Sequence, residues 1–263
     1  MDILSGKLDK RGKLIVPEDQ AYIKFDVGLA GEAPHSAIWL SETDDRFVIG
    51  IEPLSYHWEM LRQYEVSSGI RDYPENYPIL QLEEGVVKLN RENISEIGDR
   101  FCGLQCAVDN VEEISEMDFY MMDPTDGASG SSSLLKPTEK HPRFIEKVVK
   151  TPVVSLEMIL DHVDWERFPF IEHIKTDCEG KDFDVVKSIG KYLDRIVFIT
   201  SEWSVNNEGH WEGQNNNVDF THFMIHNNFH VTGYKGCQDV LFINKNYLDE
   251  IINLKLNSKM LGL

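Results

Sequence analysis

The chain has 263 residues and a formal net charge of −19, because 45 acidic side chains outnumber 26 basic ones. This length fits one large domain, since domains of about 100 to 250 residues are common. The acidic balance repels polyanions, so it disfavours nucleic acids and anionic lipid surfaces as partners.

Cysteine usage and the apolar segments indicate the compartment. The four cysteines (Cys102, Cys106, Cys178 and Cys237) form no C-x-x-C pair, and we expect reduced thiols. The first residues, MDILSGKLDKRGK, lack the apolar stretch of a signal peptide, and no segment approaches the roughly 18 apolar residues of a membrane helix. We expect a soluble, cytoplasmic protein with no membrane partner, and the composition leaves a homo-oligomer open.

Short apolar runs alternate with segments of helical period, which predicts an α/β fold with a mostly parallel sheet. The final two expected strands are separated by only four residues and must be antiparallel, because a parallel return needs a crossover of about a dozen residues. The prediction is a sandwich around a mostly parallel seven-stranded sheet that ends in an antiparallel hairpin, a layout that resembles Rossmann-like methyltransferases. The expected strands are residues 22–27, 46–52, 103–108, 171–177, 195–202, 229–234 and 239–244.

Three helices and three irregular segments complete the outline. Pro34 suits the first turn of a helix over PHSAIWLSE, and helices are also expected over 55–64 and 181–193. Residues 1–20 are an N-terminal extension in which KLDKRGKLIV could form a small hairpin, and residues 21–263 form the single domain. Within it we expect an insertion at about 65–100. The Gly-, Ser- and Pro-rich stretch at about 123–143 is either a flexible loop or a substrate lid.

The stretch DVGLAG, residues 26–31, spans the end of the first expected strand and the loop after it. Alone it is consistent with an ordinary turn. Glu52, which ends the second strand 24 residues after Gly28, strengthens a cofactor interpretation, because an acidic side chain there can accept both ribose hydroxyls of a nucleoside. The loop has no Lys or Arg, which disfavours a pyrophosphate. S-adenosylmethionine carries a sulfonium and no phosphate, and it suits Asp26 and Glu52.

An ordered set of segments within about residues 22–202 resembles the FkbM-type methyltransferase family, and KTDCEG is its most diagnostic piece. The resemblance implies transfer of a methyl group from S-adenosylmethionine to a hydroxyl oxygen of a sugar or other small molecule, which would be the partner of this chain. The segments are IKFDVGLAG, FVIGIEPL, LQCAVDN, DFYMMDP, SSSLL, VVSLEMIL and HIKTDCEGKDFDVVKSI.

The resemblance also implies a set of cofactor-binding residues. Asp26, Gly28 and Gly31 would cradle the methionine part, and Glu52 would hold the ribose. The adenine edge would lie against Cys106, Ala107 and Val108, and the rest of the set is Leu29, Ala30, Pro53 and Ser132. The chain departs from the family where D-V-G-A-N-x-G has its second glycine. Glu32 stands there and the glycine falls at 31, which changes the loop.

Acidic residues at strand ends are the expected catalytic groups. Asp177 and Glu179 follow the fourth strand, and either carboxylate could remove a proton from the acceptor in an in-line methyl displacement. Glu202 ends the fifth strand and should lie beside Asp177, so these two carboxylates could instead hold Mg²⁺. Glu179 could alternatively cap the helix that follows it.

The segment WSVNNEGHWEGQNNN offers Trp203, His210 and Trp211 as a sugar-binding surface, or it is simply a loop. His210 could act as a general base. His222, His226 and His230 are four residues apart, but we expect Asn227 and Asn228 to end the helix there, which disfavours a metal site. Cys178 lies inside the expected site and could react with thiol reagents.

Two further functions remain open at this stage. An RNA ribose methyltransferase would keep the fold and cofactor, but it needs a basic groove that the −19 charge disfavours. A non-catalytic cofactor-binding or interaction module is favoured by the glycine-poor loop.

Overall fold

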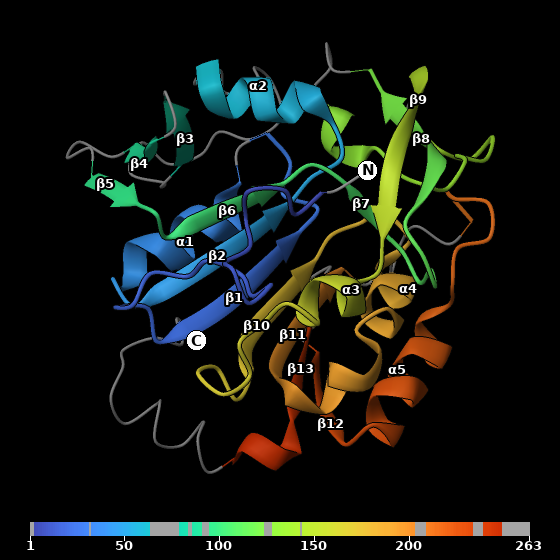
Figure 1. The fold of residues 1–263 in the computed structure, drawn as a ribbon. Coiled ribbons are helices and arrows are strands. Elements are labelled where there is room, and N and C mark those ends of the chain that lie inside the picture. Colours follow the sequence, from blue (N-terminus) through green and yellow to red (C-terminus); the bar gives the residue numbers. More distant parts are fainter. Residues whose placement is uncertain are drawn as a thin grey trace.

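The computed structural model describes residues 3–31, 33–63, 79–83, 86–90, 95–123, 128–142, 144–202, 209–233 and 239–248 (Figure 1). A seven-stranded sheet runs through the molecule, with strand order β12-β13-β11-β10-β1-β2-β6. Its strands are β1 (Tyr22–Val27), β2 (Arg46–Ile51), β6 (Phe101–Leu104), β10 (Ile171–Thr176), β11 (Ile196–Glu202), β12 (Phe229–Gly233) and β13 (Asp239–Asn244).

Strand direction follows the expected pattern. β6, β2, β1, β10 and β11 pair in parallel, and β13 pairs antiparallel with both β11 and β12. The predicted α/β class and the terminal antiparallel hairpin are therefore confirmed, and the sheet is compatible with a Rossmann-like fold. The last strand of the described residues, β13, lies between two earlier strands, β11 and β12.

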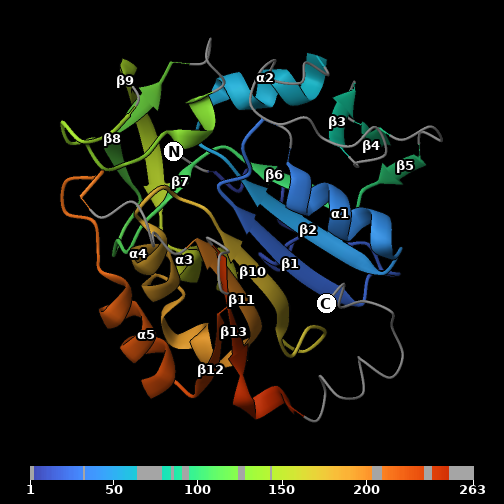
Figure 2. The ribbon, with the colours of Figure 1, turned by 180° about the vertical axis from the view of Figure 1, so that it is seen from behind.

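Helices cover both faces of this sheet (Figure 2). The larger apolar core joins Ile23, Phe25 and Val27 of β1 to buried residues of α3 (Leu156–Leu160), α4 (Asp182–Lys187) and α5 (Asn217–His226). A second core on the other face joins Val48 of β2 to α1 (Pro34–Glu42) and α2 (Ser55–Gln63). Burial of these side chains stabilises the sandwich, at about 25 cal/mol per Å² of apolar surface removed from water.

Two small sheets flank the main one and correct the predicted outline. β3 (Ile79–Glu83), β4 (Val86–Asn90) and β5 (Ser95–Gly98) form an antiparallel sheet inside the expected insertion, where no strands were predicted. β8 (Ser115–Met122), β9 (Ile145–Val154) and β7 (Ala107–Val108) form the other. The single strand predicted over 103–108 is wrong, because its apolar run contributes β6 to the main sheet and β7 to the small one.

The predicted helix over 181–193 is interrupted. α4 ends at Lys187, and a separate 3₁₀ turn covers Gly190–Arg195. Gly190 has φ +59° between them, a left-handed conformation that an α-helix cannot contain. A Cβ at this position would also collide with the carboxylate of Glu157. The apolar spacing of three and four residues therefore continues across two elements.

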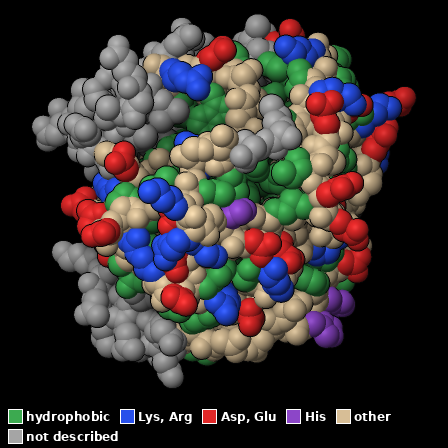
Figure 3. Space-filling view, in the orientation of Figure 1, with side chains coloured by type: hydrophobic (Ala, Val, Ile, Leu, Met, Phe, Trp, Pro, Cys, Tyr) green, Lys and Arg blue, Asp and Glu red, His purple; other side chains and the backbone are tan. Residues whose placement is uncertain are grey.

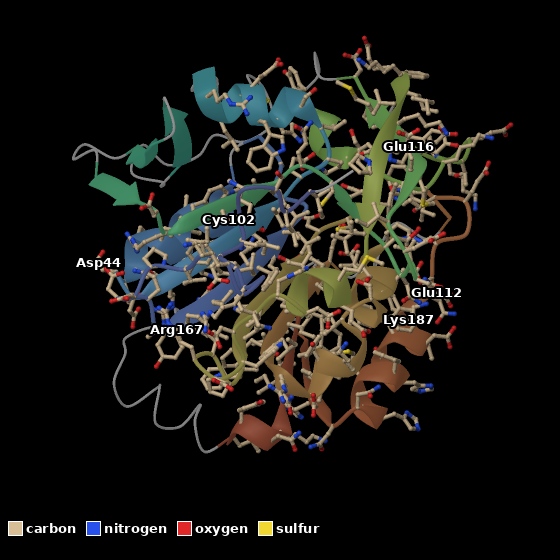
Figure 4. All side chains as sticks on the ribbon, viewed as in Figure 1. Asp44, Cys102, Glu112, Glu116, Arg167 and Lys187 are labelled. Carbon is tan, nitrogen blue, oxygen red and sulfur yellow. The ribbon has the colours of Figure 1, made fainter. Side chains whose placement is uncertain are left out.

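The N-terminal segment packs into the domain. Leu8 and Leu14 form the antiparallel bridge of the small hairpin that the sequence suggested, and Leu14 is buried in the larger core. Lys13 Nζ donates to the carbonyl oxygens of Asp161 and Val163 just after α3. Arg167, labelled in Figure 4, donates to backbone carbonyls of residues 16, 17 and 20.

The expected lid loop is held to its surroundings over much of its described length. Ser133 pairs with Tyr120 of β8 through backbone hydrogen bonds of 2.8 and 3.2 Å. Pro137 forms a bridge with Trp211, and the Thr138 N–H donates to the His210 carbonyl at 2.8 Å. Residues 132–138 therefore form a fixed wall. None of the helices in the described part of the chain has both the length and the apolar composition needed to span a bilayer.

Candidate active site

The residues that the sequence singles out meet at one edge of the main sheet, where β1, β2, β10 and β11 end. The loop 28–31 follows β1, and Glu52 follows β2. Asp177 and Glu179 follow β10, while Glu202 is the last residue of β11. The carboxyl ends of parallel strands form the usual ligand-binding edge of open α/β sheets, so the geometry gathers these side chains where a ligand would bind.

Glu52 is buried and connects the two loops at this edge. Its Oε2 accepts the Ala30 N–H at 3.1 Å, and its Oε1 accepts the Leu54 N–H at 2.9 Å. His57 Nδ1 lies 3.1 Å from Oε1 but is not aligned for a hydrogen bond, and this buried nitrogen has no other described partner. Each carboxylate oxygen retains a second lone pair for a hydroxyl donor.

The loop after β1 is tightly built. Gly28 has φ +81°, and a Cβ there would collide with the Asp177 carbonyl oxygen. The backbone of Gly28 therefore approaches the backbone at the end of β10 closely, and this contact requires a glycine. Beside Gly31 a Cβ would lie 2.6 Å from the sulfur of Met60. Glu32, the departure from the family pattern, falls outside the described residues.

Two alanines in this loop adopt left-handed backbone conformations, Ala30 with φ 54° and Ala33 with φ 46°. Such conformations cost on the order of 1 kcal/mol each for a residue with a Cβ. In these conformations the Ala30 N–H donates to Glu52, and Ala33 is the residue from which α1 begins.

Asp26 fastens the start of α1. Its Oδ2 accepts the Ser36 N–H at 2.9 Å and the Ser36 hydroxyl at 2.7 Å, which satisfies a helix N-terminus that has no cap of its own. The other oxygen, Oδ1, is buried without a hydrogen-bond partner among the described residues. A buried carboxylate oxygen of this kind is costly unless a donor reaches it.

Three carboxylates converge at the ends of β10 and β11. One oxygen each from Asp177, Glu179 and Glu202 lies within 4.8 Å of the other two, a spacing that could hold a metal ion. The sequence paired Asp177 with Glu202, and the structure adds Glu179. Lys175 Nζ donates to Asp177 Oδ2 at 2.9 Å and is itself buried. Its position inside KTDCEG was the signal that could have identified it.

The cluster strongly perturbs its own protonation. Burial, followed by the charges of Asp177 and Asp182, raises the pKa of Glu179 to about 8. Burial and then the Glu179 and Asp177 charges raise the pKa of Glu202 to about 10. Burial disfavours the charged form of Lys175, but Asp177 and Asp26 outweigh it and raise the lysine pKa. Near neutral pH, Glu179 and Glu202 are therefore mostly protonated when no cation is bound.

The side chain of Glu179 is held by the wall above it. It accepts hydrogen bonds from Ser131 and Trp211, and its backbone carbonyl accepts the Ser133 hydroxyl at 2.8 Å. The alternative in which Glu179 caps α4 is therefore wrong, because the cap residue Lys181 and the nearby Asp182 carboxylate occupy that turn. Glu179 itself has a left-handed backbone, with φ 48°.

Trp211 forms part of this wall. Its side chain is buried against Met122 and Leu135, and a Cβ on Gly180 would lie 2.8 Å from its indole ring. The expectation that this ring stacks on a sugar is wrong, because its faces are covered by protein. Trp203 lies outside the described residues. The ring of His210 meets the ring of His141 edge to face, with 5.7 Å between the ring centroids, and the His210 backbone carbonyl accepts the Thr138 N–H.

The remaining candidates lie around these two centres. Cys106, Ala107 and Val108 are buried next to Glu52, and burial raises the Cys106 pKa to about 12. Leu29 is buried beneath the loop, and Pro53 joins Glu52 to Leu54. The Ser132 hydroxyl accepts the Met122 N–H at 3.0 Å, so Ser132 ties down β8.

The structure also bears on the expectations for the three spaced histidines and for Cys178. α5 ends at His226, Asn228 adopts φ 66°, and His230 lies on β12, as predicted. Burial raises the pKa of Cys178 well above its usual value, and its thiol lies against the Val27 carbonyl at 3.8 Å. A raised thiol pKa disfavours the nucleophilic thiolate, which argues against the expected reactivity of Cys178.

Sequence reasoning missed His57, Ser131 and Asp182. Burial and the Asp177 charge raise the pKa of Asp182 to about 6, and its Oδ1 accepts the Cys178 N–H at 3.1 Å.

Comparisons of the chain with protein-family models, with curated proteins and with solved structures give no significant match.

Proposed function

We propose that this chain is an S-adenosylmethionine-dependent O-methyltransferase that acts on a hydroxyl group of a sugar or another small molecule. One observation carries the proposal. The EP, DVG and KTDCEG segments lie at the ends of the adjacent strands β2, β1 and β10, in that order, of a sheet whose antiparallel β13 lies between β11 and β12. A parallel sheet finished by such a hairpin is the layout of Rossmann-like methyltransferases, and the strand ends are where its ligands bind.

The residues at the ends of β1 and β2 fit the cofactor. When bound, S-adenosylmethionine would supply the activated methyl group. Glu52 would accept hydrogen bonds from ribose hydroxyls through the lone pairs left free by Ala30 and Leu54. The unpartnered Oδ1 of Asp26 is a ready acceptor for an ammonium group, and a positive ligand relieves the cost of burying it.

The residues at the ends of β10 and β11 fit the acceptor. Asp177 is the best candidate base, because its side chain is 38% exposed and Lys175 pairs with its Oδ2, while no contact of its Oδ1 occurs among the described residues. Glu179 and Glu202, with pKa values of about 8 and about 10, hold protons near neutral pH and are poor bases there. Ser131, Ser133 and Trp211 keep Glu179 in place beside the acceptor.

A divalent cation fits the same three carboxylates. When bound, Mg²⁺ would lower the pKa of an acceptor hydroxyl. Asp177, Glu179 and Glu202 would be its protein ligands, and ionisation of the two glutamates on binding would release protons. We expect cation affinity to rise with pH through the pKa of Glu179. Calorimetry of Mg²⁺ binding in buffers of different ionisation enthalpy would count the released protons.

The direct test is transfer of a labelled methyl group from S-adenosylmethionine to a panel of glycosides and phenols, with Mg²⁺ and with a chelator. We expect Asp177→Asn to lower kcat at least 100-fold, because a general base typically contributes about 10²–10⁴-fold to the rate. The matched control is Glu112→Gln, at an exposed carboxylate in the loop before β8 (Figure 4). Equal activity of both variants would overturn the assignment of Asp177.

A non-catalytic cofactor-binding module remains the second candidate, and two contacts favour it. Glu52 already accepts two backbone N–H groups, and Met60 fills the space beside Gly31. Tight binding of S-adenosylhomocysteine without methyl transfer to any acceptor in the panel would support this alternative over the enzyme.

A further inference from the structure

His57 is a buried histidine whose Nδ1 has no aligned hydrogen-bond partner among the described residues. It is 3% exposed and lies near the start of α2, and none of the contacts proposed above uses it. A buried polar nitrogen without a partner is costly, so its presence in a folded protein calls for a reason. Glu52, which is 4% exposed, supplies one, because its Oε1 lies 3.1 Å from this nitrogen.

The backbone holds the His57 ring and the Glu52 carboxylate close together. The His57 N–H donates to the Leu54 carbonyl at 3.1 Å, and the Trp58 indole N–H donates to the Glu52 carbonyl at 2.8 Å. Pro53, between Glu52 and Leu54, restricts the connecting backbone further. The turn that carries Glu52 and the helix that carries His57 therefore form one unit, and the approach of Nδ1 to Oε1 is built into it.

The chemistry of this contact places the ring hydrogen on Nδ1. A carboxylate oxygen only accepts hydrogen bonds, and an imidazole nitrogen without a hydrogen is an acceptor too. Two acceptors 3.1 Å apart repel each other, whereas an N–H that faces a carboxylate is attracted to it. The described residues give Glu52 no pair with a lysine or an arginine, so the imidazole is its only side-chain partner there.

The contact between His57 and Glu52 is short enough for a hydrogen bond and lacks only alignment. Hydrogen bonds of functional groups are often poorly aligned until a ligand binds and then tighten. Glu52 Oε2 accepts the Ala30 N–H and Oε1 accepts the Leu54 N–H, so each oxygen has one further lone pair. A small rotation of the imidazole would direct Nδ1–H to the further lone pair of Oε1.

We propose that His57 is a positioning residue of the ribose site, which donates from Nδ1 to Oε1 of Glu52 and fixes the carboxylate for the cofactor. The inference rests on the proposed function, because it takes a ribose to be the ligand of Glu52. With Oε1 occupied by Leu54 and His57, the remaining lone pair of Oε2 receives a ribose hydroxyl. A carboxylate held in this way loses little freedom on binding, which favours tight binding of the cofactor.

Titration calorimetry with two ligands tests this role. The ligands are S-adenosylhomocysteine and its 2′,3′-dideoxy analogue, which lacks both ribose hydroxyls. His57→Leu should weaken binding of S-adenosylhomocysteine about tenfold or more, because a hydrogen bond to a charged group is lost, and should leave the affinity for the analogue unchanged. An equal loss for both ligands would show that His57 serves the fold alone and would overturn the proposal.

The matched control is His222→Leu. His222 is an exposed residue of α5, where Figure 3 shows histidine side chains at the surface. This variant makes the same chemical change far from Glu52 in the sequence, so it should bind both ligands as the unaltered chain does. Thermal unfolding verifies that the variants of both histidines are folded.

Two polar replacements distinguish the ring nitrogens of His57. The side-chain amide nitrogen of asparagine can take the position of Nδ1, and that of glutamine can take the position of Nε2. His57→Asn should therefore bind S-adenosylhomocysteine within about threefold of the unaltered chain, whereas His57→Gln should bind it as weakly as His57→Leu does. The reverse order, or equal affinity of all three variants, would contradict the role of Nδ1.

A measurement without ligand separates this inference from the proposed function. Two-bond correlation of ¹H and ¹⁵N in the imidazole rings should show the hydrogen on Nδ1 of His57, and the spectrum of His57→Leu assigns the signals. A neutral ring with its hydrogen on Nε2 would overturn the proposal even if S-adenosylhomocysteine binds. A chain that has the hydrogen on Nδ1 but does not bind this ligand would overturn the proposed function, and the ribose role with it, while the contact with Glu52 stands.

Discussion

The two ends of the main sheet treat buried charge in opposite ways. At the amino ends, Arg46 Nε and Nη2 bind both oxygens of Glu172 at 2.9 and 3.0 Å, and Lys24 Nζ lies 3.7 Å from the same carboxylate. At the carboxyl ends, Asp177 has Lys175, but the described residues give Glu179 and Glu202 no ion pair. One end is paired in charge and the other carries an excess of carboxylates.

This difference separates a structural network from a candidate site. Paired buried ions are tolerated because each compensates the other, and burial lowers the Lys24 pKa to about 8 although Glu172 opposes the shift. An uncompensated cluster raises carboxylate pKa values and costs stability, which marks a place for a proton or a cation. The carboxyl end also contains Ala30, Ala33 and Glu179 in left-handed conformations.

The largest expected effect comes from breaking the paired end. Glu172→Gln leaves Arg46 and Lys24 buried without a counter-charge, so it should lower the free energy of unfolding by about 3–5 kcal/mol. Urea denaturation at neutral pH measures this change. Replacing Arg46 and Glu172 together by methionine should cost less than Glu172→Gln alone. A single variant as stable as the unaltered chain would contradict the comparison.

At the carboxyl ends of the sheet, ionisation of the buried carboxylates should lower the stability of the fold. The folded-state pKa values of Glu179 and Glu202 lie above those of an unfolded glutamate, so the stability they contribute is present at low pH and is lost as the pH rises through about 8 and then about 10. Between pH 6 and pH 10, Glu202→Gln should flatten this decline by on the order of 1–2 kcal/mol. Glu112→Gln is the control, and urea titrations at each pH are the measurement. An unchanged decline would break the comparison.

The smallest expected effect concerns backbone strain. Ala30→Gly removes the Cβ from a left-handed residue and should stabilise the fold by about 0.5 kcal/mol. Ala37→Gly, inside α1, should instead destabilise it by about 1 kcal/mol or more, because helix interiors disfavour glycine. Thermal unfolding compares the two. The same sign for both changes would show that strain in the loop is not what distinguishes this end.

Sequence patterns predicted the main sheet because its strands are short apolar runs separated by helices. They overextended helix 181–193, since apolar spacing continues past Gly190 into the next turn. They also missed β9, whose Pro152 argues against a strand, and that residue is accommodated because its edge is unpaired there.

Some features of the candidate site could likewise be predicted from the sequence and others could not. Convergence of Asp177 and Glu202 followed from adjacent parallel strands, whose ends share an edge. The contacts of Ser131 and Trp211 with Glu179 join segments that are distant in sequence, and no local pattern indicates them. The close approach of Gly28 to the backbone of Asp177 also joins distant segments, and no local pattern indicates it.

Titration calorimetry of S-adenosylhomocysteine binding tests the central claim most directly. The account predicts saturable binding by the unaltered chain. It also predicts that Glu52→Ala weakens this binding by about 1–3 kcal/mol, the cost of leaving buried polar partners unsatisfied. Glu112→Gln should bind unchanged, and circular dichroism would verify that each variant is folded. No heat of binding with the unaltered chain, or equal affinity for the Glu52→Ala variant, would contradict the account.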